Sequence, residues 1–217
     1  MHFKLEHPTL RLALVTADGV ECAASSEDLL ELMRRAEQSV RADASAFPEA
    51  VRAEMRNVLR VGGYKPTGRG KPASEFLLRI ARDEGLPRVN NLVDINNLVS
   101  LKTALPISIL DRRRLGGELS IRFGRPGEKY VFNHSGQEMD IGGIPVVCGD
   151  ASDQPVGNAV RDSMLAKVGA ETREVLAVIY GSRQLPSGHL ESAAQQLATL
   201  LETFAAATRC ETSFVPS

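Results

Sequence analysis

The sequence contains few cysteines, and they form no pattern typical of metal binding or of a disulfide framework. Cys22, Cys148 and Cys210 are odd in number and lie far apart, and no CxxC pair occurs. The spacing therefore indicates neither a zinc site nor a small disulfide-stapled domain. Reduced thiols in a cytosolic environment are the simplest explanation of this pattern.

Long apolar runs and a strong net charge are also missing. The first residues, MHFKLEHPTL, have no apolar core typical of a signal peptide, and no run approaches the length that spans a bilayer. Lysine and arginine number 26 against 27 acidic residues, so the net charge is -1. We expect a cytoplasmic protein that contacts no membrane, and any binding to nucleic acid would require a local basic patch.

Recognised catalytic and cofactor motifs are absent as well. No G-x-S-x-G, HExxH, P-loop or GxGxxG occurs, and no pair of carboxylates has catalytic spacing. His2 and His7 lie near the amino terminus, and His189 precedes a helix. His134 falls in a turn-forming stretch, whose chemistry explains it. The residues alone therefore predict no metal and no cofactor.

The chain has a clear order of secondary structure. A short strand at residues 10–15 precedes helical patterns, one of which begins near Pro48 and another of which we expect Ser74 to cap and Gly85 to end. A long amphipathic helix follows residues 187–188. Between the helical parts, turn signals separate short β-type runs, which predicts a sheet of hairpins and an α+β fold. These runs are residues 107–110, 118–123, 129–133, 144–148, 155–160 and 175–180.

The most unusual stretch is residues 86–111, LPRVNNLVDINNLVSLKTALPISILD. Asn90, Asp94 and Asn97 recur at four- and three-residue steps, which place them on one side of a helix. A solvated face would carry lysine and glutamate, whereas a row of amides needs protein partners or a ligand. Capping is the structural alternative, and Asp94 is expected to be the N-cap of a helix that runs to Thr103. Asn97 lies past the cap positions.

Positive charge is concentrated between residues 52 and 82. The glycine- and proline-containing segment 64–71, YKPTGRGK, carries three cations, and the flanking helical patterns add more. Flexible cationic loops suit phosphate contacts, although a solvated surface loop is the more frequent case. We expect one exposed RNA-binding face beside a pocket, formed by Arg56, Arg60, Lys65, Arg69 and Lys71.

Three runs, VDINNLVSL, LPISILD and LGGELSIR, resemble the B3/B4 editing domain of the phenylalanyl-tRNA synthetase beta subunit, and most closely its free-standing relatives. The resemblance extends from about Tyr64 to Tyr180. It implies a mixed, mainly antiparallel sheet with helices packed on it, and a pocket between the two. It also implies contact with the aminoacylated 3′ end of tRNA rather than with DNA.

The resemblance divides the chain into three expected segments. Residues 1–62 would form an N-terminal strand and helices that pack on the main domain. Residues 63–210 would form the B3/B4-like domain, which ends in the C-terminal helix. Residues 211–217, ETSFVPS, would be a frayed tail.

The resemblance further implies positions in the site. Asn97 matches a pocket asparagine of the family, and Pro106 matches its proline. The chain departs from the family at Ser108, where a histidine is usual, and near Val178, where a glutamate reads the tyrosine hydroxyl. The catalytic positions implied are Ser108 and Asn97. The substrate-binding positions implied are Asn96, Asn97, Pro106, Gly157, Arg161, Asp162, Ser163 and Thr172.

Two functions remain open at this point. The first is a trans-acting deacylase, in which Asn96, Asn97 and Ser108 place a water and stabilise an oxyanion on an ester that is already activated. The second is a non-catalytic module that binds tRNA or an amino-acid-like ligand. Ser108 in place of histidine favours the second function, and the retained Asn97 suits both.

Overall fold

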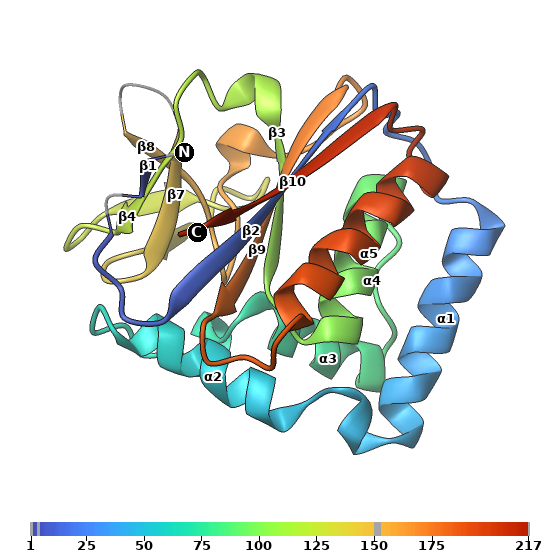
Figure 1. Ribbon diagram of the computed structural model, residues 1–217, viewed down its shortest axis with the longest axis horizontal. Helices are drawn as coiled ribbons and strands as arrows, with labels where there is room; N and C mark the ends of the chain where they lie inside the picture. The colour runs from blue at the N-terminus through green and yellow to red at the C-terminus, as the bar shows by residue number, and fades with distance from the viewer. Residues whose placement is uncertain (1, 4, 150–152, 217) are drawn as a thin grey trace.

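The computed structural model describes residues 2–3, 5–149 and 153–216, and shows a mixed, mainly antiparallel α+β fold (Figure 1). Within these residues, two four-stranded sheets and one two-stranded hairpin are packed with five α-helices. Most of the helices gather on one side of the first sheet, as the resemblance implies. No helix in the described part of the chain combines the length and the apolar character needed to cross a membrane.

The first sheet is fully antiparallel and has the strand order β10-β2-β9-β3. β2 pairs with β9 along its whole length, from Leu10 with Ser182 to Asp18 with Glu174. Because β2 lies between β10 and β9, the N-terminal segment contributes an inner strand of this sheet. The expected boundary between this segment and the main domain at residue 62 stays a prediction. The strands are β2 (Leu10–Asp18), β3 (Ile107–Asp111), β9 (Glu174–Ser182) and β10 (Arg209–Val215).

The expected frayed tail is wrong, because β10 continues through residues 211–215 and pairs with β2 from Arg209 to Val215. This strand covers the outer edge of β2, which would otherwise present unpaired backbone groups. The strand was not predicted because few of its side chains are even partly buried, and the exposed ones are polar, so the sequence shows little alternation of apolar and polar residues. Residue 217 lies outside the described residues.

The second sheet has the order β1-β4-β7-β8, and only its β1-β4 pair is parallel. β8 lies beside β3, so the two sheets meet near the middle of the molecule. The hairpin β5-β6 projects from this part of the fold. The strands are β1 (His2–Phe3), β4 (Ser120–Phe123), β5 (Lys129–Val131), β6 (Glu138–Asp140), β7 (Pro145–Gly149) and β8 (Gln154–Asn158).

Helix α4 is the centre of the helical layer, since it packs against α1, α3, α5 and β3. All of its residues except Val93 and Lys102 are buried, including the polar ones. The core side carries Ile95, Leu98 and Val99, as the spacing predicted. The helices are α1 (Glu27–Ala42), α2 (Glu49–Arg60), α3 (Ala73–Asp83), α4 (Asn91–Thr103) and α5 (His189–Phe204).

The start of α4 differs from the prediction. Asn90 is the N-cap, and its side chain accepts a hydrogen bond from the Val93 N–H at 2.9 Å. Asp94 lies in the first turn instead, where its two oxygens accept from the Val89 N–H at 3.0 Å and from the Ser25 hydroxyl at 2.7 Å. Asn90 and Asp94 are both residue types that cap helices, and they lie four residues apart. The backbone of Asn90 is extended, as an N-cap requires, and this conformation makes Asn90 the cap. The predicted end at Thr103 is confirmed.

Ser74 is also not the cap that was expected. Helix α3 begins at Ala73 after Pro72, which has no side-chain hydrogen bond to offer, and the buried Ser74 hydroxyl has no partner among the described residues. The end of the helix agrees with the prediction. Gly85 has φ +96° and its N–H donates to the Ile80 carbonyl at 2.7 Å, a conformation that glycine adopts with little strain.

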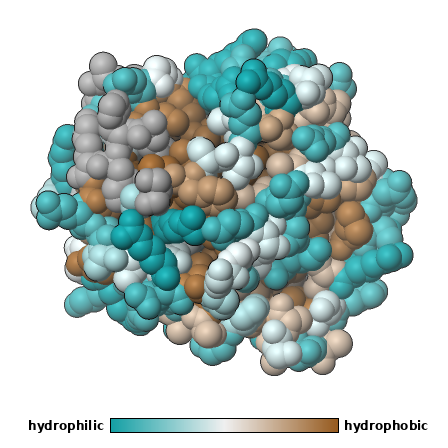
Figure 2. Space-filling model, viewed as in Figure 1, coloured by the Kyte–Doolittle hydropathy of each residue, from teal (hydrophilic) through white to brown (hydrophobic). Residues whose placement is uncertain are grey.

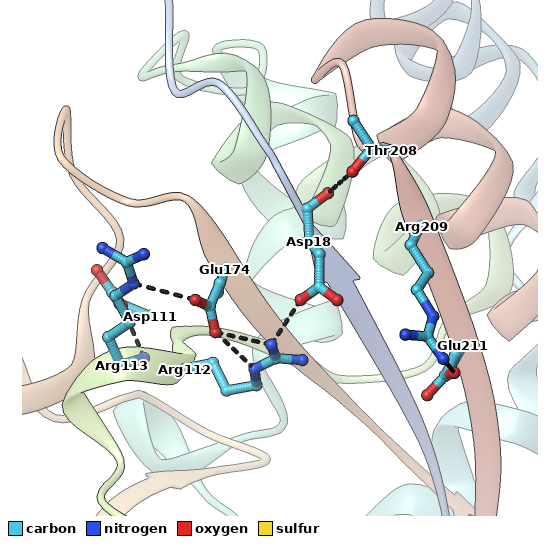
Figure 3. A network of polar contacts seen from close by, with 8 residues as sticks. All are labelled: Asp18, Asp111, Arg112, Arg113, Glu174, Thr208, Arg209 and Glu211. Carbon is cyan, nitrogen blue, oxygen red and sulfur yellow. Dashed lines mark hydrogen bonds and ion pairs between the residues drawn. The ribbon is translucent and has the colours of Figure 1, made fainter.

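A charged cluster joins the strand ends at one edge of the first sheet (Figure 3). Arg112, just after β3, donates to Asp18 at 2.5 Å and to Glu174 at 2.7 Å, which connects the ends of β2, β9 and β3. Arg113 adds a contact to Glu174 at 3.1 Å. All members are partly exposed, so each pair contributes little to stability.

The face in Figure 2 is mainly hydrophilic, with a hydrophobic area between α1 and α5. A cavity of about 450 Å³ lies there, lined by Leu32, Leu98, Leu101 and Leu200. Arg35 and Lys102 also line it. Among the described residues, no carboxylate side chain lines this cavity, and it shares no lining residue with the larger cavity beside α3 and α4.

Replacement of Asp94 by alanine should destabilise the fold, because it leaves the Val89 N–H and the Ser25 hydroxyl without their acceptor. A lost hydrogen bond to a buried charged group costs about 1.5–3 kcal/mol. Urea unfolding followed by circular dichroism measures this loss. Asp83→Ala, on the exposed end of α3, is the matched control and should change the free energy of unfolding by about 0.5 kcal/mol or less. Equal effects of the two substitutions would contradict the assignment.

Candidate functional site

A cavity of about 740 Å³ lies between α3 and α4 on one side and β3 with the segment after β8 on the other. Its size falls within the usual range of small-molecule sites, roughly 300–1,000 Å³. Apolar side chains make up a little more than half of its lining residues, and polar or cationic side chains make up the rest. The polar lining residues are Asn90, Asn96, Asn97, Asn133, His134 and Asp162, and the cationic ones are Arg69, Lys71, Arg114, Arg161 and Lys167.

The two central asparagines of α4 line this cavity, as predicted. Asn97 is only 8 % exposed, yet its side-chain amide makes no hydrogen bond to any residue that the structure describes. Asn96 donates to the Ile107 carbonyl at 3.3 Å, while its own amide oxygen has no partner among the described residues. An amide left unsatisfied costs about 1–3 kcal/mol. The pair therefore offers unused donors and acceptors to whatever enters the cavity.

Asp162 is the carboxylate of the cavity. It keeps a partial opening to the cavity, but protein surrounds it on the other sides, and this burial raises its pKa to about 7. Hydrogen bonds from Ser108 and from the backbone N–H groups of Asn158 and Ile109, together with the nearby Lys167, oppose the rise. A carboxyl with such a pKa exchanges its proton near neutral pH, as general acids and bases do.

Ser108 lies behind Asp162 and does not line the cavity. Its hydroxyl is fully buried and donates to Asp162 Oδ1 at 2.5 Å, and the Tyr180 hydroxyl lies 3.1 Å away. The reason is strand alternation: Ile107 and Ile109 point into the cavity, so Ser108 points to the other face of β3. The geometry therefore does not support the predicted contact of Ser108 with a substrate, and the Ser108 hydroxyl contacts Asp162 instead. Val178 pairs with Ser108 on β9 and is also buried.

The other predicted substrate-binding residues fall into two groups. Arg161 lines the cavity, and its guanidinium lies 4.7 Å from the centre of the Phe132 ring. Gly157 lies directly behind Asp162, where an added Cβ would come within 2.8 Å of the carboxylate. These two positions contact the site or shape it.

Pro106, Ser163 and Thr172 have structural contacts instead. The Pro106 carbonyl accepts from the Tyr180 N–H at 3.0 Å. The Ser163 hydroxyl accepts from the Leu165 N–H, and the Thr172 hydroxyl donates to Asp111 at 2.8 Å. Because none of the three lines the cavity, direct substrate contact by them is not supported by the geometry.

The predicted RNA-binding cations divide in a similar way. Arg69 and Lys71 line the cavity, which places two of the five beside the site. Arg56 forms a bidentate ion pair with the buried Glu75, so its positive charge is neutralised within the protein. Arg60 donates to Asn57 at 2.8 Å on the exposed side of α2, and Lys65 is exposed. Arg56 is therefore corrected to a structural residue.

Several residues that line the cavity were not predicted from the sequence to do so. Arg114 follows β3, and Lys167 follows the turn after Asp162 and donates to the Phe132 carbonyl at 2.6 Å. His134 was assigned to a turn, and it does lie in the β5-β6 connection, but the hairpin carries it to the cavity. Their positions depend on how distant segments pack, so no local pattern could have identified them.

No group of histidine, cysteine, aspartate or glutamate side chains in the described part of the chain could hold a metal ion. Amides, a carboxyl and cations are the groups that this cavity offers. They can hydrogen-bond a carbonyl or an amine, position a water and attract a phosphate.

The fold and the cavity define an α+β domain with a cavity in which amides and one carboxyl lie among cations. A family model described as "B3/4 domain" matches residues 65–206, more than half of the chain, and the protein belongs to this family. The match continues past Tyr180, where the resemblance of the sequence runs ended, and includes α5.

The chain is also similar to short parts of two curated relatives and to part of one solved structure. The chain is 37% identical over 57 residues to the phenylalanine–tRNA ligase beta subunit of Nitrobacter winogradskyi, covering 26% of this chain and 7% of the relative. It is 30% identical over 89 residues to that of Streptococcus pneumoniae, covering 41% and 11%. A crystal structure of an N-terminal fragment of the Pyrococcus horikoshii phenylalanyl-tRNA synthetase beta subunit is 11% identical, with a TM-score of 0.47, covering 58% and 45%.

Asp162→Asn should change how stability depends on pH. The folded parent holds the Asp162 proton more tightly than the unfolded chain, since burial raises the pKa to about 7 from about 3.9. Its stability therefore falls as pH rises from about 4 to about 7, and the variant lacks this loss. Between pH 5 and pH 8 the variant should gain roughly 2 kcal/mol relative to the parent in urea unfolding, with roughly 4 kcal/mol as the upper limit over the full range. A constant difference would contradict the raised pKa.

Proposed function

We propose that this protein binds the aminoacylated 3′ end of tRNA and hydrolyses the ester of a mischarged tRNA in trans. The observation that carries the proposal is the joint placement of the unpaired Asn97 amide and the Asp162 carboxyl in one cavity with Arg69 and Lys71. The cations suit the phosphates of the RNA end. The amide and the carboxyl suit the two needs of ester hydrolysis, which are oxyanion stabilisation and proton transfer.

The reaction assigns one task to each group. A water attacks the ester carbonyl carbon while the Asp162 carboxylate accepts a proton from it. The Asn97 side-chain N–H donates to the carbonyl oxygen, where negative charge develops. The carbon–oxygen bond to the ribose then breaks, and the Asp162 proton passes to the leaving ribose oxygen. A pKa of about 7 suits both transfers, because the group gives and takes a proton with little cost at neutral pH.

Ser108 acts in this scheme through Asp162 rather than on the substrate. Its hydroxyl donates to Oδ1 of the carboxylate, and the scheme assigns the proton transfer with water to Oδ2. Burial raises the pKa of the Tyr180 phenol well above its usual value, so that group stays protonated and can donate to Ser108. The relay orients Asp162 and limits its basicity.

A non-catalytic binding module is the second candidate. The observation in its favour is that Ser108, at the position where the resemblance implies a histidine, is sealed from the cavity and cannot touch a substrate. A binding module would use the same amides and cations without turnover. The two candidates differ in one measurable quantity, the rate of ester cleavage above the spontaneous rate.

The deciding experiment is a deacylation screen of the purified protein against a panel of charged and mischarged tRNAs. At least one member should be released faster than in buffer alone. For that member, Asp162→Asn should slow release by about 100-fold and Asn97→Ala by about tenfold or more, as expected for a lost base and a lost oxyanion donor. Asn57→Ala, on the exposed side of α2, is the matched control and should leave the rate unchanged.

The outcomes separate the two candidates. Binding of the tRNA panel without release from any member would support the binding module instead. An Asn97→Ala variant that binds and deacylates as the parent does would contradict the cavity as the site.

Salt dependence tests the cationic surround. Phosphate contacts release counterions, so the slope of log affinity for tRNA against log salt should become shallower by about 1–2 in the Arg69→Ala, Lys71→Ala double variant. The control is the Arg35→Ala, Lys102→Ala double variant, which removes equal charge at the separate apolar cavity. Filter binding between 50 and 300 mM salt measures both slopes. Equal slopes in the two variants would show that only net charge matters.

A further inference from the structure

Phe76 has an unusual position for a large aromatic side chain. The face of α3 turned to the cavity carries Ala73, Phe76, Leu77 and Ile80. Leu77 and Ile80 are buried, whereas Phe76 is 50 % exposed. Among the described residues, it is the one aromatic side chain in the set of exposed large hydrophobics. A half-exposed ring at the cavity offers a flat apolar surface to a molecule that binds there.

The surroundings of Phe76 are cationic. The Arg79 guanidinium lies over the ring at 5.1 Å from its centre, a cation–π arrangement that covers one face. No other ring or cation is stacked on Phe76 in the part of the chain that the structure describes. Arg69 and Lys71 line the same cavity from the loop that leads into α3. A flat apolar surface set among positive charges matches a ligand that is itself flat and linked to negative charge.

We propose that Phe76, held by Arg79, is a stacking platform for a nucleobase in the single-stranded end of an RNA. The phosphates next to that base would lie against Arg69 and Lys71. This inference rests on the proposed function and adds the residue that reads the RNA end. Stacking uses the face of the base, which every base has, so the platform holds the end of the strand without selecting its sequence.

The absence of tryptophan from the chain allows a direct test. Phe76→Trp introduces a single tryptophan at the platform, which can be excited selectively over the three tyrosines, and a base stacked on it should quench its emission. The probe is an uncharged RNA hairpin with a short single-stranded 3′ end. A matched hairpin whose 3′ end carries sugars and phosphates without bases should bind weakly and quench little. Leu32→Trp, 36 % exposed at the separate apolar cavity, is the control and should not respond to either hairpin.

Affinity for the same hairpin separates stacking from general apolar contact. Phe76→Ala should weaken binding by about 5- to 100-fold, as expected for a lost base–aromatic stack. Phe76→Leu keeps an apolar side chain without a ring and should weaken binding nearly as much, while Phe76→Tyr should bind as the parent does. Since Phe76 is half exposed, these variants should unfold at the temperature of the parent.

The possible results distinguish this inference from the proposed function. If Phe76→Leu binds the hairpin as tightly as the parent, or if Phe76→Trp is quenched equally by both hairpins, the platform is wrong and the deacylation proposal stands on its own result. If the parent neither binds the hairpin nor releases any amino acid from the tRNA panel, both fall together.

Discussion

The structure depends on the burial of α4, a helix that carries polar side chains and is nevertheless enclosed on almost every side. Burial of polar groups is unfavourable unless each finds a partner. Asn91 satisfies this constraint by joining three segments, since it accepts from the Ala23 N–H and donates to the Glu21 and Phe204 carbonyls. Asp94 ties the same helix to the segment before α1. The helical layer is thereby fixed around α4 by directed bonds as well as by apolar packing.

The same constraint explains the site. Asn97 is the member of the polar row that has no hydrogen-bond partner among the described residues, and its side chain lines the cavity. On the opposite wall, Asp162 has several partners but too little solvent, and its pKa rises for that reason. The Asn97 amide and the Asp162 carboxyl thus both owe their properties to the cavity, which lies where the helical layer and the sheets do not pack directly against each other. The cations supplied by the loop before α3 and by the segments after β3 and β8 surround this gap.

The sequence predicted more of the architecture than of the site. Helix and strand periods identified most elements, because periodicity reflects which side of an element faces the core. The ends were less secure: Asn90 rather than Asp94 caps α4, and β10 occurs where a frayed tail was expected. In both cases the local residues permit two outcomes, and the packing of neighbouring segments selects one. Strand β6 was missed because it has only three residues and one buried side chain.

For the site, the sequence by itself determined that Asn97 lies on the polar side of a helix past its caps, and that Arg69 and Lys71 sit in a cationic loop. Tertiary structure alone decided that Ser108 faces away from the cavity while Asp162 faces into it. A strand's alternation defines which residues share a face, but not which face meets a helix layer or a second sheet. The pairing of β3 with β9 and its position beside β8 settle that question. The reason is physical: side-chain direction is local, whereas the environment into which a side chain points is assembled from segments far apart in the chain.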